Sequence, residues 1–258
     1  MAQPIIEFKH VAKQYDDTVV LKSVDLEIEA GKFYTLLGPS GSGQTTILRL
    51  IAGFLEASSG DILFEGERIN DVPAEKRRVN TVFQNYALFP NMNVFENVAF
   101  GMSIKGKPKN EIKAKVAEML ELVKLGGYED REISELSGGQ KRRVSIGIEL
   151  LSPSPYFILD EPSSGLDALS DRNLLRTLKI LAKSANKSIV VITHNTENLA
   201  IFDKIIFLSK GRPTFAGTYE ELLLEYKTSD PYMIRKYMDM NIADVYQELN
   251  ASTRIYKI

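Results

Sequence analysis

Residues 38–46 read GPSGSGQTT and directly follow the apolar run from Phe33 to Leu37. A helical pattern begins after them, with apolar side chains at Ile47, Leu48, Leu50 and Ile51. A strand, a glycine-rich turn and a helix in succession direct backbone N–H groups and a helix N-terminus at one point, which suits a phosphate group. The stretch therefore predicts an α/β fold with a phosphate-binding turn at the end of a strand, although a glycine-rich turn by itself is often only a turn.

The turn lacks one residue of the pattern G-x-x-x-x-G-K-[ST]. Thr45 stands at the Mg²⁺-ligating hydroxyl position, whereas Gln44 replaces the lysine that reaches the β- and γ-phosphates. A lost charge-assisted contact costs about 1.5–3 kcal/mol, so we expect weakened ATP binding. We expect catalysis to suffer more, because cations stabilise the transferring phosphoryl group. The candidate phosphate-binding residues are Gly38, Pro39, Ser40, Gly41, Ser42, Gly43, Gln44, Thr45 and Thr46.

Composition excludes several functions. The 258 residues are 44% hydrophobic, and 32 basic and 34 acidic side chains give a net charge of −2. This balance supplies no basic field for nucleic acid. The absence of cysteine excludes disulfides and thiolate metal sites. Neither a secretion-signal pattern nor a run of about 18 apolar residues is present. If the protein acts at a membrane, we therefore expect it to be a peripheral subunit on the cytoplasmic face.

Strand and helix patterns alternate along the chain. Strands are predicted at 5–11, 19–28, 33–37, 61–64, 78–83, 156–159 and 188–193, and helices at 139–150 and 168–183. A helical lobe at about 89–137 is indicated by one apolar helical face: Ile112, Val116, Met119, Leu120 and Val123. We expect a mostly parallel sheet with an antiparallel N-terminal subdomain, forming one domain over 1–226, and assign no chemistry to the tail 227–258.

Two adjacent carboxylates, Asp160 and Glu161, end the apolar run 157–159. One suits Mg²⁺ and the next suits activation of an attacking water. Two acids after a strand are also what a solvated helix start looks like, and these two residues alone leave both interpretations open.

Further motifs decide between them: VFQNYALFP around Gln84, LSGGQ at 136–140, SGLD at 164–167 and THN at 193–195. With the phosphate loop and ILDEP at 158–162, the set resembles the ATP-binding cassette (ABC) transporter family over about residues 5–225. The resemblance implies an ATPase with ATP and Mg²⁺ as cofactors. By this resemblance, Tyr15 would stack on adenine and His194 would touch the γ-phosphate. Thr45, Gln84 and Asp160 would hold Mg²⁺, and Gln84 would also contact the membrane partner. Glu161 would be the general base. A structural role remains open for Tyr15 and His194.

The resemblance also implies partners. Ser137, Gly138, Gly139 and Gln140 would face the nucleotide held by a second subunit in a head-to-tail dimer, and Asp167 would cross the same interface. Transmembrane transporter subunits would be the other partners.

Two subfamilies are suggested by different parts of the chain. EGERIN at 65–70 and the stretch 73–101 resemble spermidine/putrescine importer ATPases, whereas RRVSIGIELL at 142–151 and DEPSSGLD at 160–167 resemble pigment and lipid exporter cassettes. This contrast leads to the hypothesis of a chimera joined near residue 140. The alternatives to a transport ATPase are a cassette that binds ATP without hydrolysing it, because of Gln44, and a non-transport cassette of DNA repair or translation.

Overall fold

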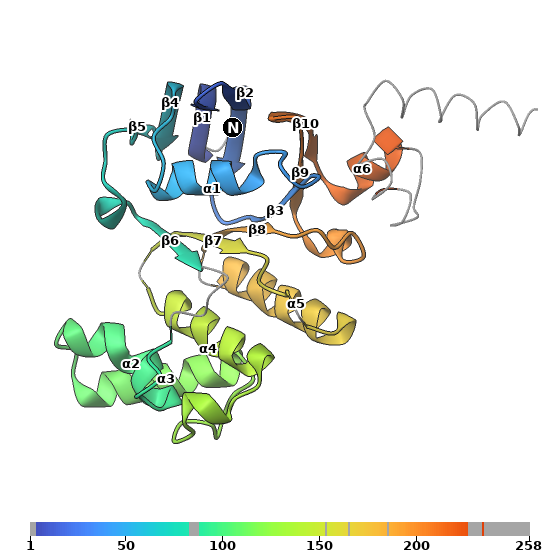
Figure 1. Cartoon of the computed structure of the whole chain (residues 1–258). Coiled ribbons are helices and arrows are strands. Elements are labelled where there is room, and N and C mark those ends of the chain that lie inside the picture. Colours follow the sequence, from blue (N-terminus) through green and yellow to red (C-terminus); the bar gives the residue numbers. More distant parts are fainter. Residues whose placement is uncertain are drawn as a thin grey trace, which may run out of the picture. The chain divides into compact units, whose positions relative to one another are not determined.

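The structure is a computed structural model that describes residues 4–82, 88–152, 154–164, 166–184, 186–226 and 234. The chain divides into two compact units, the first comprising Met1–Arg77 and Val190–Ile258 and the second Arg78–Ile189. Figure 1 shows the elements of both units in chain order. No helix in these described ranges is long and apolar enough to cross a bilayer.

The first unit contains an antiparallel sheet in the order β2-β1-β4-β5. Its long strands are β1 (Pro4–Tyr15) and β2 (Thr18–Glu29), followed by β4 (Ser59–Phe64) and β5 (Glu67–Arg68). Buried and exposed residues alternate at the end of β2, where Val24, Leu26 and Ile28 point into the core. This alternation is the pattern of a sheet with one buried face.

The second sheet has the strand order β10-β9-β3-β8-β7-β6. In the first unit β3 (Phe33–Leu37) runs parallel to β9 (Lys204–Ser209), and β10 (Arg212–Gly217) is antiparallel to β9. In the second unit β6 (Val79–Val82) runs parallel to β7 (Tyr156–Asp160). The strand β8 (Ser188–Ile192) spans the boundary between the units. Both β3 and β8 are buried along their whole length, as expected for strands covered on both faces. The predicted fold class is confirmed.

The second unit carries most of the helices. The helix α2 (Val94–Ile104) packs on α3 (Lys109–Leu122) and on α4 (Gly138–Leu150), and α5 (Ala168–Ser184) follows β7. A capping box begins α2, in which Asn93 Oδ1 accepts from the Glu96 N–H at 2.8 Å and Glu96 Oε2 accepts from the Asn93 N–H at 3.0 Å. The second unit also has the short helix η2 (Ile133–Glu135). The short helices of the first unit are η1 (Ala74–Lys76), η3 (Leu199–Ile201) and α6 (Tyr219–Tyr226).

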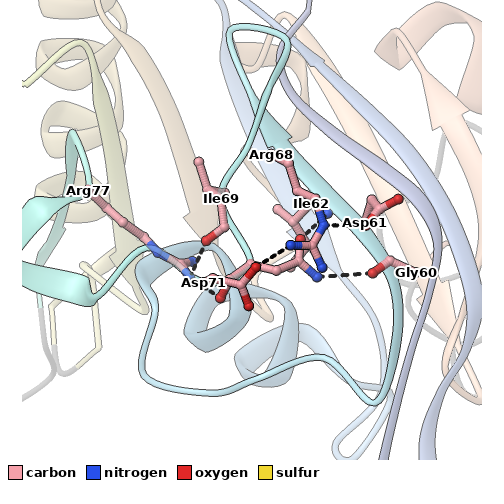
Figure 2. Close-up of polar contacts among 8 residues, drawn as sticks. Gly60, Asp61, Ile62, Arg68, Ile69, Asp71 and Arg77 are labelled. Carbon is pink, nitrogen blue, oxygen red and sulfur yellow. Dashed lines mark hydrogen bonds and ion pairs between the residues drawn. The ribbon is translucent and has the colours of Figure 1, made fainter.

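Arg77 holds the C-terminal end of α1 (Gln44–Ala52), the helix that follows the glycine-rich turn. Its guanidinium donates to the carbonyls of Leu50 at 2.6 Å and Ile51 at 2.9 Å, where helical carbonyls lack intrahelical donors. It also donates to carbonyls of the segment after β5, namely those of Ile69, Asn70 and Val72. Figure 2 shows Arg77 beside Ile69, with Arg68 between Asp61 and Asp71. Burial lowers the pKa of the Arg77 guanidinium.

We expect Arg77→Met to lower the free energy of unfolding by about 2–3 kcal/mol, because several carbonyls lose a charged donor. Thermal and urea unfolding measure the change. Arg212→Met is the control, because Arg212 is an exposed side chain of the same unit. Equal stability of the two variants would contradict the assignment of Arg77 as the connection between α1 and the segment after β5.

A second polar connection lies in the second unit, between α4 and β6. Glu149 Oε2 accepts from Asn80 Nδ2 at 2.8 Å, and Asn80 Oδ1 accepts from the Ser152 hydroxyl at 3.2 Å. Burial raises the pKa of Glu149, and the bond from Asn80 only partly offsets that rise. The folded protein therefore binds a proton at this carboxyl more tightly than the unfolded chain does, so ionised Glu149 opposes folding.

Glu149→Gln is expected to raise the melting temperature at pH 7, because it keeps an acceptor for Asn80 and removes the buried charge. The destabilisation by Glu149 is fully present above its raised folded pKa and disappears as pH falls below the ordinary glutamate value. The gain from Glu149→Gln should therefore shrink between pH 7 and pH 4. Melting curves at a series of pH values test this, and a gain that does not depend on pH would contradict it.

Candidate functional site

The glycine-rich turn between β3 and α1 has a backbone that only glycine fits. Gly43 has φ of 106° and directly precedes α1. A Cβ at this position would lie 2.5 Å from Leu21 Cδ2, a side chain that is fully buried under the turn. No side chain caps the N-terminus of α1. Its first N–H groups lack intrahelical acceptors and are therefore available to an anion.

Gln44 lies inside this turn and is only 5% exposed. Its Nε2 donates to the Gly38 carbonyl at 3.1 Å, and its Oε1 accepts from the Ser42 hydroxyl at 3.0 Å. The amide thus connects the beginning of the loop to its end. The structure gives Gln44 a role within the loop that its sequence position alone did not predict, and this role supplies no positive charge.

Of the remaining loop residues, Gly38 and Ser42 are buried and the others are more accessible. Ser40, Gly41 and Thr45 are exposed, and Pro39 and Thr46 are half-buried. Thr45, in the first turn of α1, is therefore accessible, as its predicted role requires.

Two further predicted residues belong to the first unit. His194 is exposed and follows Ile192, the end of β8, which is the sheet neighbour of β3. Tyr15 ends β1 and is 39% exposed, with the Lys13 ammonium 5.0 Å from its ring centroid. An accessible aromatic ring at a strand end can stack on a planar ligand. Both side chains are therefore accessible, as their predicted roles require.

Asp160 and Glu161 lie at the carboxyl end of β7 in the second unit, and both are half-buried. Glu161 adopts φ of 45°, an unusual value for a residue with a side chain. Left-handed geometry costs roughly 1–2 kcal/mol in a non-glycine residue, so the surrounding structure must hold it. Strain of this kind is concentrated at functional sites.

The LSGGQ segment forms the start of α4. Ser137 Oγ accepts from the Gln140 N–H at 3.3 Å, and Gln140 Oε1 accepts from the Ser137 N–H at 2.8 Å. This capping box leaves Ser137 and Gly138 exposed. Gln140 Nε2 also donates to the Tyr128 hydroxyl at 3.3 Å, a contact that the sequence did not reveal.

Asp167 lies at the start of α5, where its carboxylate accepts from the Ser170 N–H at 2.9 Å and the Ser170 hydroxyl at 2.6 Å. These bonds lower the pKa of Asp167. A cavity of about 620 Å³ lies between the starts of α4 and α5, and its polar lining includes Ser137, Arg143, Asp167 and Ser170. The structure therefore brings the LSGGQ segment and Asp167 together on one accessible surface.

Gln84 lies outside the described residues, as do the tail residues 227–233 and 235–258. Within the part of the chain that is described, no three His, Cys, Asp or Glu side chains gather into a metal cluster. The predicted Mg²⁺ donors, the Thr45 hydroxyl and the Asp160 carboxylate, are hard oxygen groups that fit this ion. Mg²⁺ needs few protein ligands when substrate phosphates and waters complete its shell, so a sparse donor set is sufficient.

Gly43→Ala should destabilise the protein more than Gly41→Ala. Both glycines have positive φ, but a Cβ at Gly41 has nothing within 4 Å, whereas one at Gly43 meets Leu21. Backbone geometry alone costs roughly 1–2 kcal/mol at either site, and the clash adds to it at Gly43. Urea unfolding measures both variants. Similar losses would show that Leu21 moves away without cost.

Known proteins are similar to this chain in sequence and in fold. The family model described as ABC transporter matches residues 21–164. The chain is 45% identical over 230 residues to the spermidine/putrescine import ATP-binding protein PotA of Clostridium novyi (strain NT), covering 89% of this chain and 66% of that protein. It therefore spans slightly less than two thirds of that relative's length.

Two solved structures of the ATP-binding cassette MJ0796 are also similar, both with a TM-score of 0.73. One is a dimer in a post-hydrolysis state bound to ADP and Pi, at 28% identity, and the other is a dimer of the bacterial ABC transporter cassette, at 29% identity. Each alignment covers 83% of this chain and 98% of the other.

These matches bear on the hypothesis of a chimera. An alignment of 230 residues within a chain of 258 necessarily runs through residue 140. One relative of importer type thus accounts for both sides of the supposed junction, and the chimera is not supported. The family model covers more than half of the residues, and the chain belongs to the ABC transporter family.

Proposed function

We propose that this chain is the ATP-binding and ATP-hydrolysing subunit of an ABC importer, and that Gln44 slows its hydrolysis step. The observation that carries the proposal is the turn at Gly38–Thr46, where a left-handed Gly43 precedes a helix whose N-terminus no side chain caps. Such a terminus carries about half a positive charge and directs N–H groups at a bound anion. Family membership supports a nucleotide as that anion.

The chemistry can be assigned residue by residue. The N–H groups of the loop bind the phosphates, and Tyr15 stacks on the base. Thr45, Asp160 and Gln84 would hold Mg²⁺, and this ion would neutralise charge on the phosphates. Glu161 orients and deprotonates the attacking water, and His194 contacts the γ-phosphate. The strained backbone of Glu161 supports its assignment as the base, because strain accumulates where a side chain must be held in one direction.

A second copy of the chain would complete each site. Ser137 and Gly138 are exposed at the start of α4, and the cavity beside them reaches Asp167. The Gln140 N–H is capped by Ser137, and the exposed helix start beside it suits a phosphate held by a partner. The similar MJ0796 cassettes are dimers, which supports a dimer here.

Transmembrane subunits are the other proposed partners. The importer named in the relative from Clostridium novyi supports import as the direction of transport. The second unit offers a cavity of about 470 Å³ lined by α2, α3 and α4, with Val98, Met102 and Ile148 among its apolar residues and Glu149 beside them. A short helix of a membrane subunit would find there an apolar surface edged by charged side chains, Lys105, Lys107 and Lys115 among them. In that arrangement the transported molecule contacts the membrane subunits and not this chain.

Gln44 favours a second candidate function, a cassette that closes on ATP without turning it over. Both polar atoms of its amide are bonded inside the loop, so the γ-phosphate receives no cation from position 44. Binding loses one charged contact, whereas the transition state loses a cation where charge is redistributed. We therefore expect binding to survive and turnover to fall.

The decisive variant is Gln44→Lys. We expect steady-state phosphate release to rise by about 100-fold, the usual effect of restoring one transition-state donor. ATP affinity should rise by about tenfold or more, from the 1.5–3 kcal/mol of a charged hydrogen bond.

Gln44→Lys combined with Glu161→Gln is the control, and it should bind ATP but release little phosphate. Equal turnover of the original chain and Gln44→Lys would contradict the role given to Gln44. Absence of turnover in both would leave the non-hydrolysing cassette as the function.

A further inference from the structure

We propose that Arg142 is a positioning residue, which holds the turn around Glu161 in place and connects that turn to the start of α4. The inference rests on the proposed function, because it takes Glu161 as the general base. It concerns a residue to which the motifs of the chain assigned no role.

Arg142 is buried, with 4% of its surface exposed. Its Nη2 donates to the Asp160 carbonyl at 2.9 Å, and its Nε donates to the Pro162 carbonyl at 3.1 Å. These two carbonyls lie on either side of Glu161. One planar guanidinium therefore fixes the backbone immediately before and immediately after the proposed base.

The turn needs such a support because of its backbone geometry. Glu161 has φ of 45°, a conformation that its own side chain disfavours. Within the turn, the Ser164 N–H also donates to the Glu161 carbonyl at 3.1 Å. Hydrogen bonds from a charged donor are about twice as strong as neutral ones, so the two bonds of Arg142 are large enough to offset the strain.

Arg142 also lies in the second turn of α4, the helix that begins with the LSGGQ segment. It is four residues beyond Gly138, so the two lie on the same face of the helix. A helix moves as a rigid unit over so short a distance, and a displacement of its start displaces Arg142 and the turn bonded to it. In a head-to-tail dimer, the start of α4 faces the partner's nucleotide, whereas Glu161 acts on the chain's own. Arg142 thus connects the two nucleotide sites of the dimer.

The test measures steady-state ATP hydrolysis by the full chain carrying Gln44→Lys, with and without Arg142→Met. We expect kcat to fall at least tenfold, while KM and the dissociation constant for ATP without Mg²⁺ change by less than about twofold, because the phosphate loop is untouched. Arg176→Met is the matched control, since Arg176 is exposed on α5 of the same unit. It should keep the parental kcat.

Arg142→Lys separates positioning from folding. Lysine keeps the charge and can reach one carbonyl, but it lacks the fork that bridges both. We expect the kcat of Arg142→Lys to lie between those of the parent and Arg142→Met. Its melting temperature should be close to that of the parent. If Arg142→Met does not fold, Arg142→Lys alone decides: a parental kcat overturns the proposal.

A double-mutant cycle with Ser137→Ala tests the connection to the start of α4. If Arg142 transmits the position of that start to Glu161, the loss of kcat caused by Ser137→Ala is smaller once Arg142 is replaced. Additive losses overturn the connection, and an unchanged kcat in Arg142→Met overturns the positioning role. Absence of turnover in the Gln44→Lys parent itself overturns the proposed function and this inference together.

Discussion

The steric requirement at Gly43 determines the geometry of the phosphate loop. Leu21 of β2 lies directly under this glycine, so the N-terminal antiparallel sheet limits how the loop can turn into α1. The β9–β10 turn supports the loop from another direction, because the Gly211 N–H donates to the Ser42 carbonyl at 3.2 Å and the Gly211 carbonyl accepts from the Lys22 N–H at 2.9 Å. The antiparallel sheet and the β9–β10 turn therefore both contact this glycine-rich turn.

The sequence predicted the parts of the fold that depend on local pattern. The sequence predicts the buried strands β3, β7 and β8 and the glycine-rich turn. A buried strand appears as a continuous apolar run, and a left-handed turn position appears as a glycine. The capping box of α4 is also local, since Ser137 and Gln140 are three residues apart, but only a helix start was predicted there. Predictions for these elements needed no knowledge of distant contacts.

The connections made by arginine side chains could not be predicted in the same way. Arg77 bonds carbonyls of Leu50 and Ile51, and Arg142 bonds carbonyls of Asp160 and Pro162, at separations of 18 to 27 residues. A main-chain carbonyl is present in every residue, so nothing in the sequence marks which ones will accept. The only available signal for Arg142 was its place on the buried face of a helix, four residues before Ile146. The partners of Gln44 were hidden for the same reason.

Gln44 and Arg142 together show how binding and catalysis can depend on different physical features of one chain. Phosphate binding relies on many N–H dipoles and an open helix start, so the loss of one cation removes only a fraction of the attraction. Catalysis relies on a few groups held in fixed directions, and a displacement of about 1 Å can cost a hundredfold in rate. On the proposed function, a neutral amide at position 44 is expected to lower the first moderately and the second severely. The buried guanidinium of Arg142 is expected to act on the second, because it donates to the backbone on both sides of Glu161.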